Sequence, residues 1–447
     1  MQDQHRNDRQ RVAEAVQQAL ETARRLGASA AEASASMDSG LSVNVRLGEV
    51  ETLEYHRGQN LAVTVYQNHA KGSASTADLS PAAVTEAVEA ALRIARHTSS
   101  DPCAGLADPD LLARDFPDLD LYHPWDIDAA AAIELARACE AAGRAVDARI
   151  TNSDGASVDA FEGVSAYGNT HGFLGLREGT RHSISCSLIA EDDGGMQRDY
   201  WYTVSRVPDA LEAPEAVGRR AAERALRRLG GRKLDTRKAP VLFARELARG
   251  LAGHFVAAIS GGALYRKASF LLDTLGQAVF PDFVRVHEDP FIPRALGSAA
   301  FDQEGVATQR RDIVRDGVLQ GYVLSSYSAC KLGLRSTGNA GGVHNLIVDP
   351  GPEALDLDGL LRRMDTGLLV TELIGHGVNT VTGDYSRGAA GFWVEGGRLQ
   401  YPVEEITIAG NLRDMFRGLL AVGSDVDLRG NIRTGSWLVE EMTIAGR

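Results

Sequence analysis

The sequence contains few cysteines and no long apolar runs. Its four cysteines, Cys103, Cys139, Cys186 and Cys330, lie far apart and form no Cys-x-x-Cys pair, which predicts reduced thiols in a cytoplasmic protein. No uncharged apolar run reaches the roughly 18 residues that a membrane-spanning helix needs. The polar N-terminus lacks the apolar segment of a signal peptide. The sequence therefore predicts neither secretion nor membrane insertion.

Positive charge is also scarce, because 47 Lys and Arg residues stand against 60 Asp and Glu residues, for a net charge of −13. An electrostatic field of that sign repels phosphate backbones, so we expect no nucleic-acid partner. One basic cluster runs from Arg219 to Lys233, and its helical spacing is more typical of a solvated helix face than of a binding site. With 447 residues, the chain is long enough for two or three domains with full cores.

The first half of the chain repeats one pattern of predicted elements. Amphipathic helices are expected at 9–26 and from Ser80 onward, on either side of alternating strands over 30–76. The same order returns as helices at 129–146 and 214–229 around strands over 149–204. Seven glycines are interpreted as bends between these strands, namely Gly48, Gly58, Gly72, Gly163, Gly168, Gly172 and Gly179.

The predicted fold class is α+β, with two tandem small helix-meander-helix units followed by a larger β-rich C-terminal domain. The units are expected at 1–98 and 127–236, with a linker rich in proline and aspartate at 99–126. The C-terminal domain is expected at 237–447.

A predicted helix at 241–260 opens the C-terminal domain. Phe243, Leu247, Leu251, Phe255 and Ile259 recur every four residues and form one apolar stripe. Ser260-Gly261-Gly262 ends the helix, because glycine is favoured just past a helix end. Further along the chain, a loop is expected at 383–391. The similar segments 406–410 and 442–446 are expected to pair as strand ends.

Several segments together resemble the TldD/PmbA family. The helix is followed by Gly262 and by Tyr265-Arg266-Lys267, and 383–391 has the pattern Gly-x-x-Ser-x-Gly-Ala-x-Gly. A strand led by glycine at 58–76 matches the N-terminal part of the family. In this order and at these spacings the combination is specific, and the resemblance covers nearly the whole chain.

The resemblance implies one half of a two-chain peptidase. In TldD-type members the helix carries the zinc motif His-Glu-x-x-x-His, and in the same register this sequence has Gly253, His254 and Ala258. The family's third ligand is a cysteine near the C-terminus, but 430–436 contains none. A catalytic zinc site needs three protein ligands and an open position for water. We therefore expect no catalytic residue and no metal in this chain.

What the resemblance implies about partners follows from this difference. The chain is expected to be the non-catalytic subunit of a heterodimer whose TldD-like subunit holds the zinc. The implied substrates are unfolded or modified peptides, which a β-rich cavity wall could hold by strand addition. When alone, the chain is expected to form a homodimer.

Five residues are candidates for contact with a peptide or a partner. Gly341 and Gly342 leave room for a peptide backbone to approach beside His344, although a tight bend is the simpler interpretation. Asp384 and Ser386 lie in the predicted loop at 383–391, where turn chemistry explains them at least as well.

Two other functions stay open. An independent hydrolase would need an unrecognised site, for example around His254 or at His287-Glu288-Asp289. None of the eleven histidines lies in an HExxH or HExxxH motif, and Ser386 does not lie in a nucleophile elbow. A peptide-binding or regulatory protein with no link to a peptidase would need no catalytic group.

Overall fold

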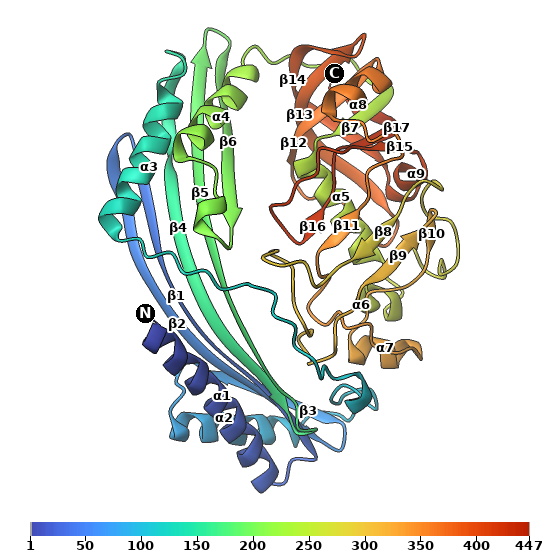
Figure 1. The fold of residues 1–447 in the computed structure, drawn as a ribbon. Coiled ribbons are helices and arrows are strands. Elements are labelled where there is room, and N and C mark those ends of the chain that lie inside the picture. Colours follow the sequence, from blue (N-terminus) through green and yellow to red (C-terminus); the bar gives the residue numbers. More distant parts are fainter. Residues whose placement is uncertain (1, 447) are drawn as a thin grey trace.

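The structure is a computed structural model that describes residues 2–446, and its first half forms one long, curved antiparallel sheet (Figure 1). The strand order is β3-β2-β1-β4-β5-β6. The strands are β1 (Ala30–Arg46), β2 (Glu49–Gln67), β3 (Ala70–Thr76), β4 (Ile150–Asn169), β5 (Leu174–Asp192) and β6 (Gly195–Ser205).

Four helices cover one face of this sheet: α1 (Gln2–Arg25), α2 (Pro81–Ala95), α3 (Ala129–Arg144) and α4 (Pro214–Arg227). Alternate residues of β1 face them. Ala33 packs with α1 and α2 in one core, and Val43 packs with α3 and α4 in another. Because side chains alternate along a strand, the intervening residues face the other way, toward the C-terminal domain (Figure 1).

The predicted α+β class, with the order helix, meander, helix occurring twice, is confirmed. The two units share one sheet, because β1 pairs with β4 from Glu32 opposite Asn169 to Val45 opposite Ala156. Of the seven glycines interpreted as bends, Gly48 and Gly172 do lie between strands. The other five lie inside strands, so that interpretation was wrong for Gly58, Gly72, Gly163, Gly168 and Gly179.

The segment at 99–126 runs against both halves of the molecule. It contains the short 3₁₀ helix η1 (Pro109–Leu111), and the Ala113 amide donates to the Gly305 carbonyl at 2.9 Å. A disulfide joins Cys103 to Cys330, so the prediction of reduced thiols was wrong for this pair. Because 227 residues separate the two cysteines in the chain, no local sequence pattern indicated that they lie in contact. Disulfides are rare in cytosolic proteins, so this bond removes one argument for a cytoplasmic location. That location stays a prediction.

The C-terminal domain contains two sheets. In the larger one the strand order is β14-β13-β12-β7-β17-β15, and β14 also pairs with β17, so that its strands close on themselves. Its strands are β7 (Arg237–Phe243), β12 (Gly367–Ile374), β13 (Asp384–Glu395), β14 (Arg398–Asn411), β15 (Leu419–Val422) and β17 (Trp437–Ala445). The smaller sheet, in the order β10-β9-β8-β11-β16, contains β8 (Val286–Glu288), β9 (Arg311–Arg315), β10 (Val318–Leu319), β11 (Leu346–Val348) and β16 (Ile432–Arg433).

The predicted helix at 241–260 begins later than expected. Residues 241–243 belong to β7, which lies between β12 and β17, and α5 spans Arg245–Ala258. The predicted loop at 383–391 was wrong, because β13 begins at Asp384. The predicted pairing of 406–410 with 442–446 is confirmed, with Ile408 opposite Ile444.

The remaining helices are short: the 3₁₀ helix η2 (Pro208–Ala210), and α6 (Gly261–Tyr265), α7 (Ser326–Leu332), α8 (Leu357–Met364) and α9 (Leu412–Arg417). Within residues 2–446, no helix is both long enough and apolar enough to span a membrane.

Candidate functional site

The three positions that correspond to the zinc motif lie along α5. Ala258 is fully buried in the core, and a Cβ at Gly253 would lie 4.0 Å from Cδ1 of Ile432. The half-buried His254 ring packs edge-on against Tyr385, with 6.2 Å between ring centroids. Burial, with the Arg387 cation nearby, lowers the pKa of His254 below its ordinary value. A neutral, packed imidazole therefore stands where the motif has its glutamate.

The segment where the family has a cysteine ligand, 430–436, contains β16 and the residues on either side of it. The Ser436 hydroxyl donates a hydrogen bond to the Asp425 carboxylate at 2.7 Å. No three His, Cys, Asp or Glu residues within 2–446 gather as a metal-binding group. Since the side chains of Gly253 and Ala258 have no nitrogen, oxygen or sulfur atom that could bind a metal, the residues present here do not fit a catalytic zinc ion.

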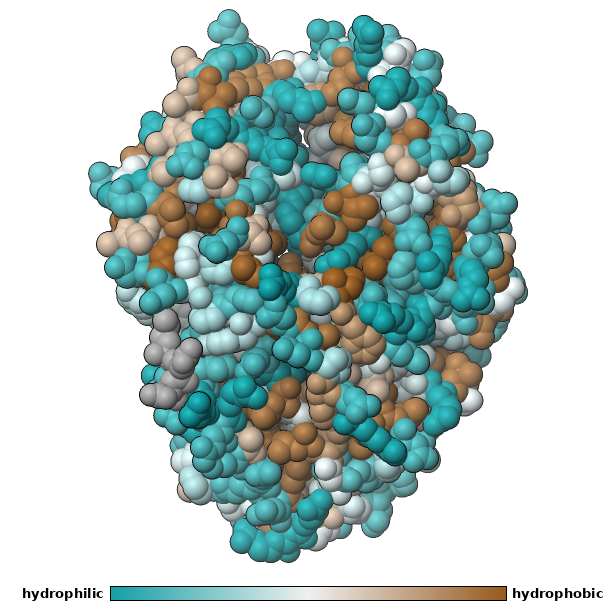
Figure 2. Space-filling model, viewed as in Figure 1, coloured by the Kyte–Doolittle hydropathy of each residue, from teal (hydrophilic) through white to brown (hydrophobic). Residues whose placement is uncertain are grey.

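The open face of the large sheet borders a hollow instead. Figure 2 shows the molecule hollowed between the sheet and the C-terminal domain. One cavity of about 480 Å³ is lined by Gly341 and His344 on the domain side and by Arg177, Arg181 and Arg206 on the sheet side. We call these three residues the arginine triad. A second hollow of about 710 Å³ adjoins it and is lined by the same three arginines.

His344 is held in the wall of this cavity by two hydrogen bonds. Its amide donates to the Glu288 carboxylate at 2.8 Å, and its ring Nε2 lies 3.2 Å from the Gly338 carbonyl. Burial lowers the pKa of His344, which favours the neutral ring at pH 7. Gly341 and Gly342 precede it with φ of 97° and 119°, a region of backbone space that favours glycine.

His287-Glu288-Asp289, the other histidine site considered, is already engaged. The buried Glu288 forms an ion pair with Arg311 at 2.9 Å and accepts a hydrogen bond from Asn339 at 2.9 Å. Asp289 contacts Arg310 at 3.0 Å. These carboxylates hold protein groups in place, which explains them without a metal.

Asp384 and Ser386 lie on β13 and do not line the cavity. Asp384 accepts a hydrogen bond from the Thr382 hydroxyl at 2.6 Å, and the exposed Ser386 pairs with Ala409 in the sheet. The structure thus brings Gly341 and His344 into one cavity with the arginine triad, while Gly342 does not line it and the other two candidates lie elsewhere.

The arginine triad is the feature that reading the sequence missed. On β5, Arg177 and Arg181 alternate with Gly175 and Gly179, so all four lie on one face of the strand. The available signal was this Gly-x-Arg-x-Gly-x-Arg alternation, but the glycine was interpreted as a bend.

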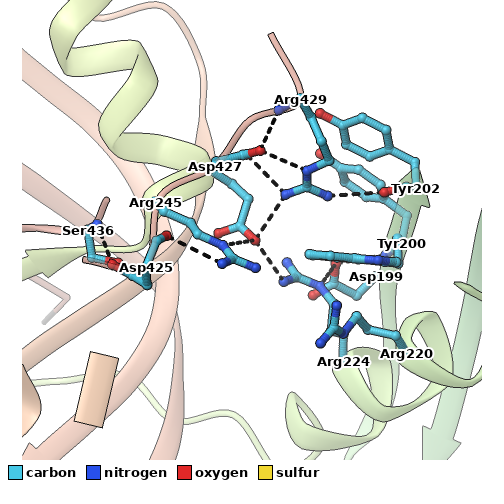
Figure 3. A network of polar contacts seen from close by, with 12 residues as sticks. Asp199, Tyr200, Tyr202, Arg220, Arg224, Arg245, Asp425, Asp427, Arg429 and Ser436 are labelled. Carbon is cyan, nitrogen blue, oxygen red and sulfur yellow. Dashed lines mark hydrogen bonds and ion pairs between the residues drawn. The ribbon is translucent and has the colours of Figure 1, made fainter. Parts of the chain in front are cut away.

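A polar network joins the sheet to the C-terminal domain beside this cavity (Figure 3). Arg429 binds the buried Asp427 through Nε at 2.9 Å, and it donates to the Tyr202 carbonyl of β6 at 3.1 Å. Its guanidinium lies 4.1 Å from the Trp201 ring centroid. Glu246, in the first turn of α5, contacts Arg429 at 3.3 Å. The network fixes the position of the segment that follows, 430–436.

Comparison with known proteins identifies the family of this chain. Three consecutive stretches match metallopeptidase domains: residues 31–95 match PmbA/TldA metallopeptidase domain 1, 122–229 the central domain and 236–446 the C-terminal domain. The chain is 53% identical to "Metalloprotease PmbA" of Escherichia coli O157:H7 over 97% of its own length and 96% of that protein. It is 52% identical to a PmbA homologue of Haemophilus influenzae, over 98% and 96% of the two chains. The chain therefore belongs to the PmbA/TldD metallopeptidase family.

Solved structures share the fold. A protein from Bacteroides thetaiotaomicron, described as a candidate modulator of DNA gyrase, matches with a TM-score of 0.92 and 30% identity, over 97% of this chain and 98% of that one. TldE from Thermococcus kodakarensis matches with a TM-score of 0.84 and 20% identity, over 97% and 100% of the chains. The second likeness is one of fold alone.

Proposed function

We propose that this chain is the non-catalytic subunit of a two-chain metallopeptidase, in which a TldD-like partner holds the zinc. The observation that carries the proposal is the chemistry of α5, where Gly253, His254 and Ala258 stand at the positions of the motif. Two of these have no donor atom, and Ala258 is fully buried.

Peptide hydrolysis requires an activated water and a group that takes its proton. The only carboxylate on α5 is that of Glu246, seven residues before Gly253. Ion-pair contacts to Arg429 at 3.3 Å and Arg224 at 3.9 Å already engage it. In this proposal the chain contributes a wall of the substrate cavity, and the partner contributes the catalytic group.

The test is a cleavage assay on casein or an unfolded peptide, with this chain alone, the TldD-like protein alone, and both mixed. We expect no cleavage by this chain alone, and more cleavage by the mixture than by the partner alone. Chelator-sensitive cleavage by this chain alone, surviving removal of trace proteases, would show that the catalytic subunit has been misplaced.

A double substitution, Gly253→His with His254→Glu, supplies a control within the chain. It restores two of the three motif residues, but Ala258 still lacks an imidazole, so the variant is expected to stay inactive. A pull-down from native cells completes the test. A stable complex without any chain that carries HExxxH would favour a binding or regulatory protein instead.

A further inference from the structure

The arginine triad combines Arg177 and Arg181 of β5 with Arg206, which directly follows β6. β5 and β6 pair with His182 opposite Ser205, which places Arg181 across from Arg206, one residue beyond the end of β6. Like charges directly opposite on neighbouring strands repel each other. Arg177 lies four residues before Arg181 on the same face of β5.

The guanidinium groups of Arg177 and Arg206 are held by carbonyl oxygens. Arg206 donates to Ala295 at 3.1 Å, to Leu296 at 3.0 Å and to Thr180 at 3.2 Å. Arg177 donates to the Asp302 carbonyl at 2.7 Å, and its guanidinium lies 4.2 Å from the Phe301 ring centroid. These contacts fix where both cations lie without neutralising either.

The Arg181 side chain is exposed to the cavity, and within residues 2–446 its guanidinium has neither a hydrogen bond nor an ion pair. Its fork of donors is therefore free. A Cβ at Gly179 would lie 2.6 Å from Nη1 of Arg206, so the glycine between the two β5 arginines makes room for the guanidinium that crosses it.

The acids near the triad are bound by other groups. The Asp302 carboxylate, whose charge acts on Arg177, accepts the amides of Glu304 and Val306 on Oδ1 and of Ala340 on Oδ2. In the adjoining hollow, each lining acid already has a partner: Asp38 with His56, Asp118 with the Asp120 amide, Asp120 with Arg294, Glu162 with Tyr122, and Glu178 with His5 and Arg9.

Burial lowers the pKa of Arg177 and of Arg206, which reports the cost of keeping these cations away from water. A buried charge without a partner is destabilising, and an anion that reaches it removes that cost. The protein has a net charge of −13, yet four arginines line this cavity, and within residues 2–446 only Arg429 among them forms ion pairs with acids.

We propose that the arginine triad binds a carboxylate of the peptide substrate, either its free C-terminus or an acidic side chain. The inference rests on the proposed function, because that function supplies peptides as ligands. Arginine matches a carboxylate with two parallel hydrogen bonds, and Arg181 has those donors free. A cavity of about 480 Å³ falls in the range of pockets that hold small ligands, so it can hold the end of a chain.

The test is isothermal titration of the full chain, without partner or metal, with three forms of one acetylated, flexible hexapeptide. The first form has a free C-terminal carboxylate, the second a C-terminal amide, and the third an amide together with one internal glutamate. We expect the free acid, the glutamate peptide or both to bind, the neutral amide to bind at least about tenfold more weakly, and added salt to weaken binding. The form that binds identifies the source of the carboxylate.

Arg181→Gln should reduce carboxylate binding about tenfold, because it removes charge-assisted hydrogen bonds. Arg181→Lys keeps the charge but loses the two parallel donors of the guanidinium, so its carboxylate affinity should lie between those of the wild type and Arg181→Gln. Arg93→Gln on the exposed side of α2 is the matched control and should change nothing.

The inference is overturned if no form binds saturably, if the neutral amide binds as well as the acids, or if Arg181→Gln behaves like Arg93→Gln. These outcomes are independent of cleavage. Carboxylate binding without cleavage by the mixed subunits would defeat the proposed function and leave the site standing, and cleavage without carboxylate dependence would do the reverse.

Discussion

Replacing Asp427 by Asn should destabilise the chain by about 3 kcal/mol, which is the low end of the range for breaking a buried ion pair. The Asp427 side chain is 1% exposed, and that of Arg429 is 12% exposed. Asp427 accepts the Arg429 amide and Nε at 2.9 Å each, and Nη2 at 3.0 Å. Asparagine keeps the shape but leaves Arg429 without this anion. The low end applies because Glu246 remains 3.3 Å from Arg429.

The same ion pair predicts a pH dependence. Burial alone would raise the pKa of Asp427, but the hydrogen bonds and charge of Arg429, with Arg249, outweigh it, and the pKa is lowered. A carboxylate with a lowered folded-state pKa contributes stability that is present above its unfolded value, about 3.9, and is lost as the pH falls through the folded value. The difference between wild type and Asp427→Asn should therefore be full at pH 7 and shrink below about pH 4.

The assay is urea unfolding followed by tryptophan fluorescence, which Trp201 beneath Arg429 makes sensitive to this region. Glu441→Gln is the matched control, since its ion pair with Lys238 at 2.9 Å is exposed on both sides and should matter far less. The reasoning would be refuted if Asp427→Asn lost no more unfolding free energy than Glu441→Gln. It would also be refuted if the stability difference between wild type and Asp427→Asn stayed constant from pH 7 to about pH 3.

Three further predictions concern the metal, the assembly and the packing. Elemental analysis after dialysis should find no stoichiometric zinc, and about one tightly held ion per chain, as a three-ligand site would give, would contradict this. Light scattering of the isolated chain at micromolar concentration should show a homodimer, and a species of monomer mass alone would count against it. Gly218→Ala should lower the free energy of unfolding by about 1–3 kcal/mol through overpacking, because its Cβ would lie 1.8 Å from the Cys139 carbonyl oxygen. Gly250→Ala, with nothing within 4 Å, is the control in thermal unfolding and should not destabilise.

Elements with a strong repeating pattern could be predicted from the sequence. The stripe of Val84, Val88 and Leu92 predicted α2, and all three are buried in the structure. Alternation at 41–45 and 61–66 predicted strands, because one face of each had to be apolar. These signals are local, so they do not depend on which distant segment provides the core.

Glycine in strands was the main source of error, because a turn and a close approach look alike in a sequence. Gly391 illustrates this, since a Cβ there would lie 1.9 Å from the Leu369 carbonyl oxygen, and the residue belongs to β13. The arginine triad was missed for a related reason. Its cavity forms only when β5 meets residues 295–303 and 340–344, and no local pattern reports that contact.

The strand order β3-β2-β1-β4-β5-β6 is symmetric about its centre. On each side of the β1–β4 junction, the three strands of one helix-meander-helix unit follow one another outward in chain order. The antiparallel junction of β1 with β4 is the self-complementary contact that two identical chains would make about a twofold axis. The covalent connection at 99–126 makes that association intramolecular, so it no longer depends on concentration. Each copy is then free to diverge, and only the second carries the arginine triad, which two identical halves would have had to carry twice.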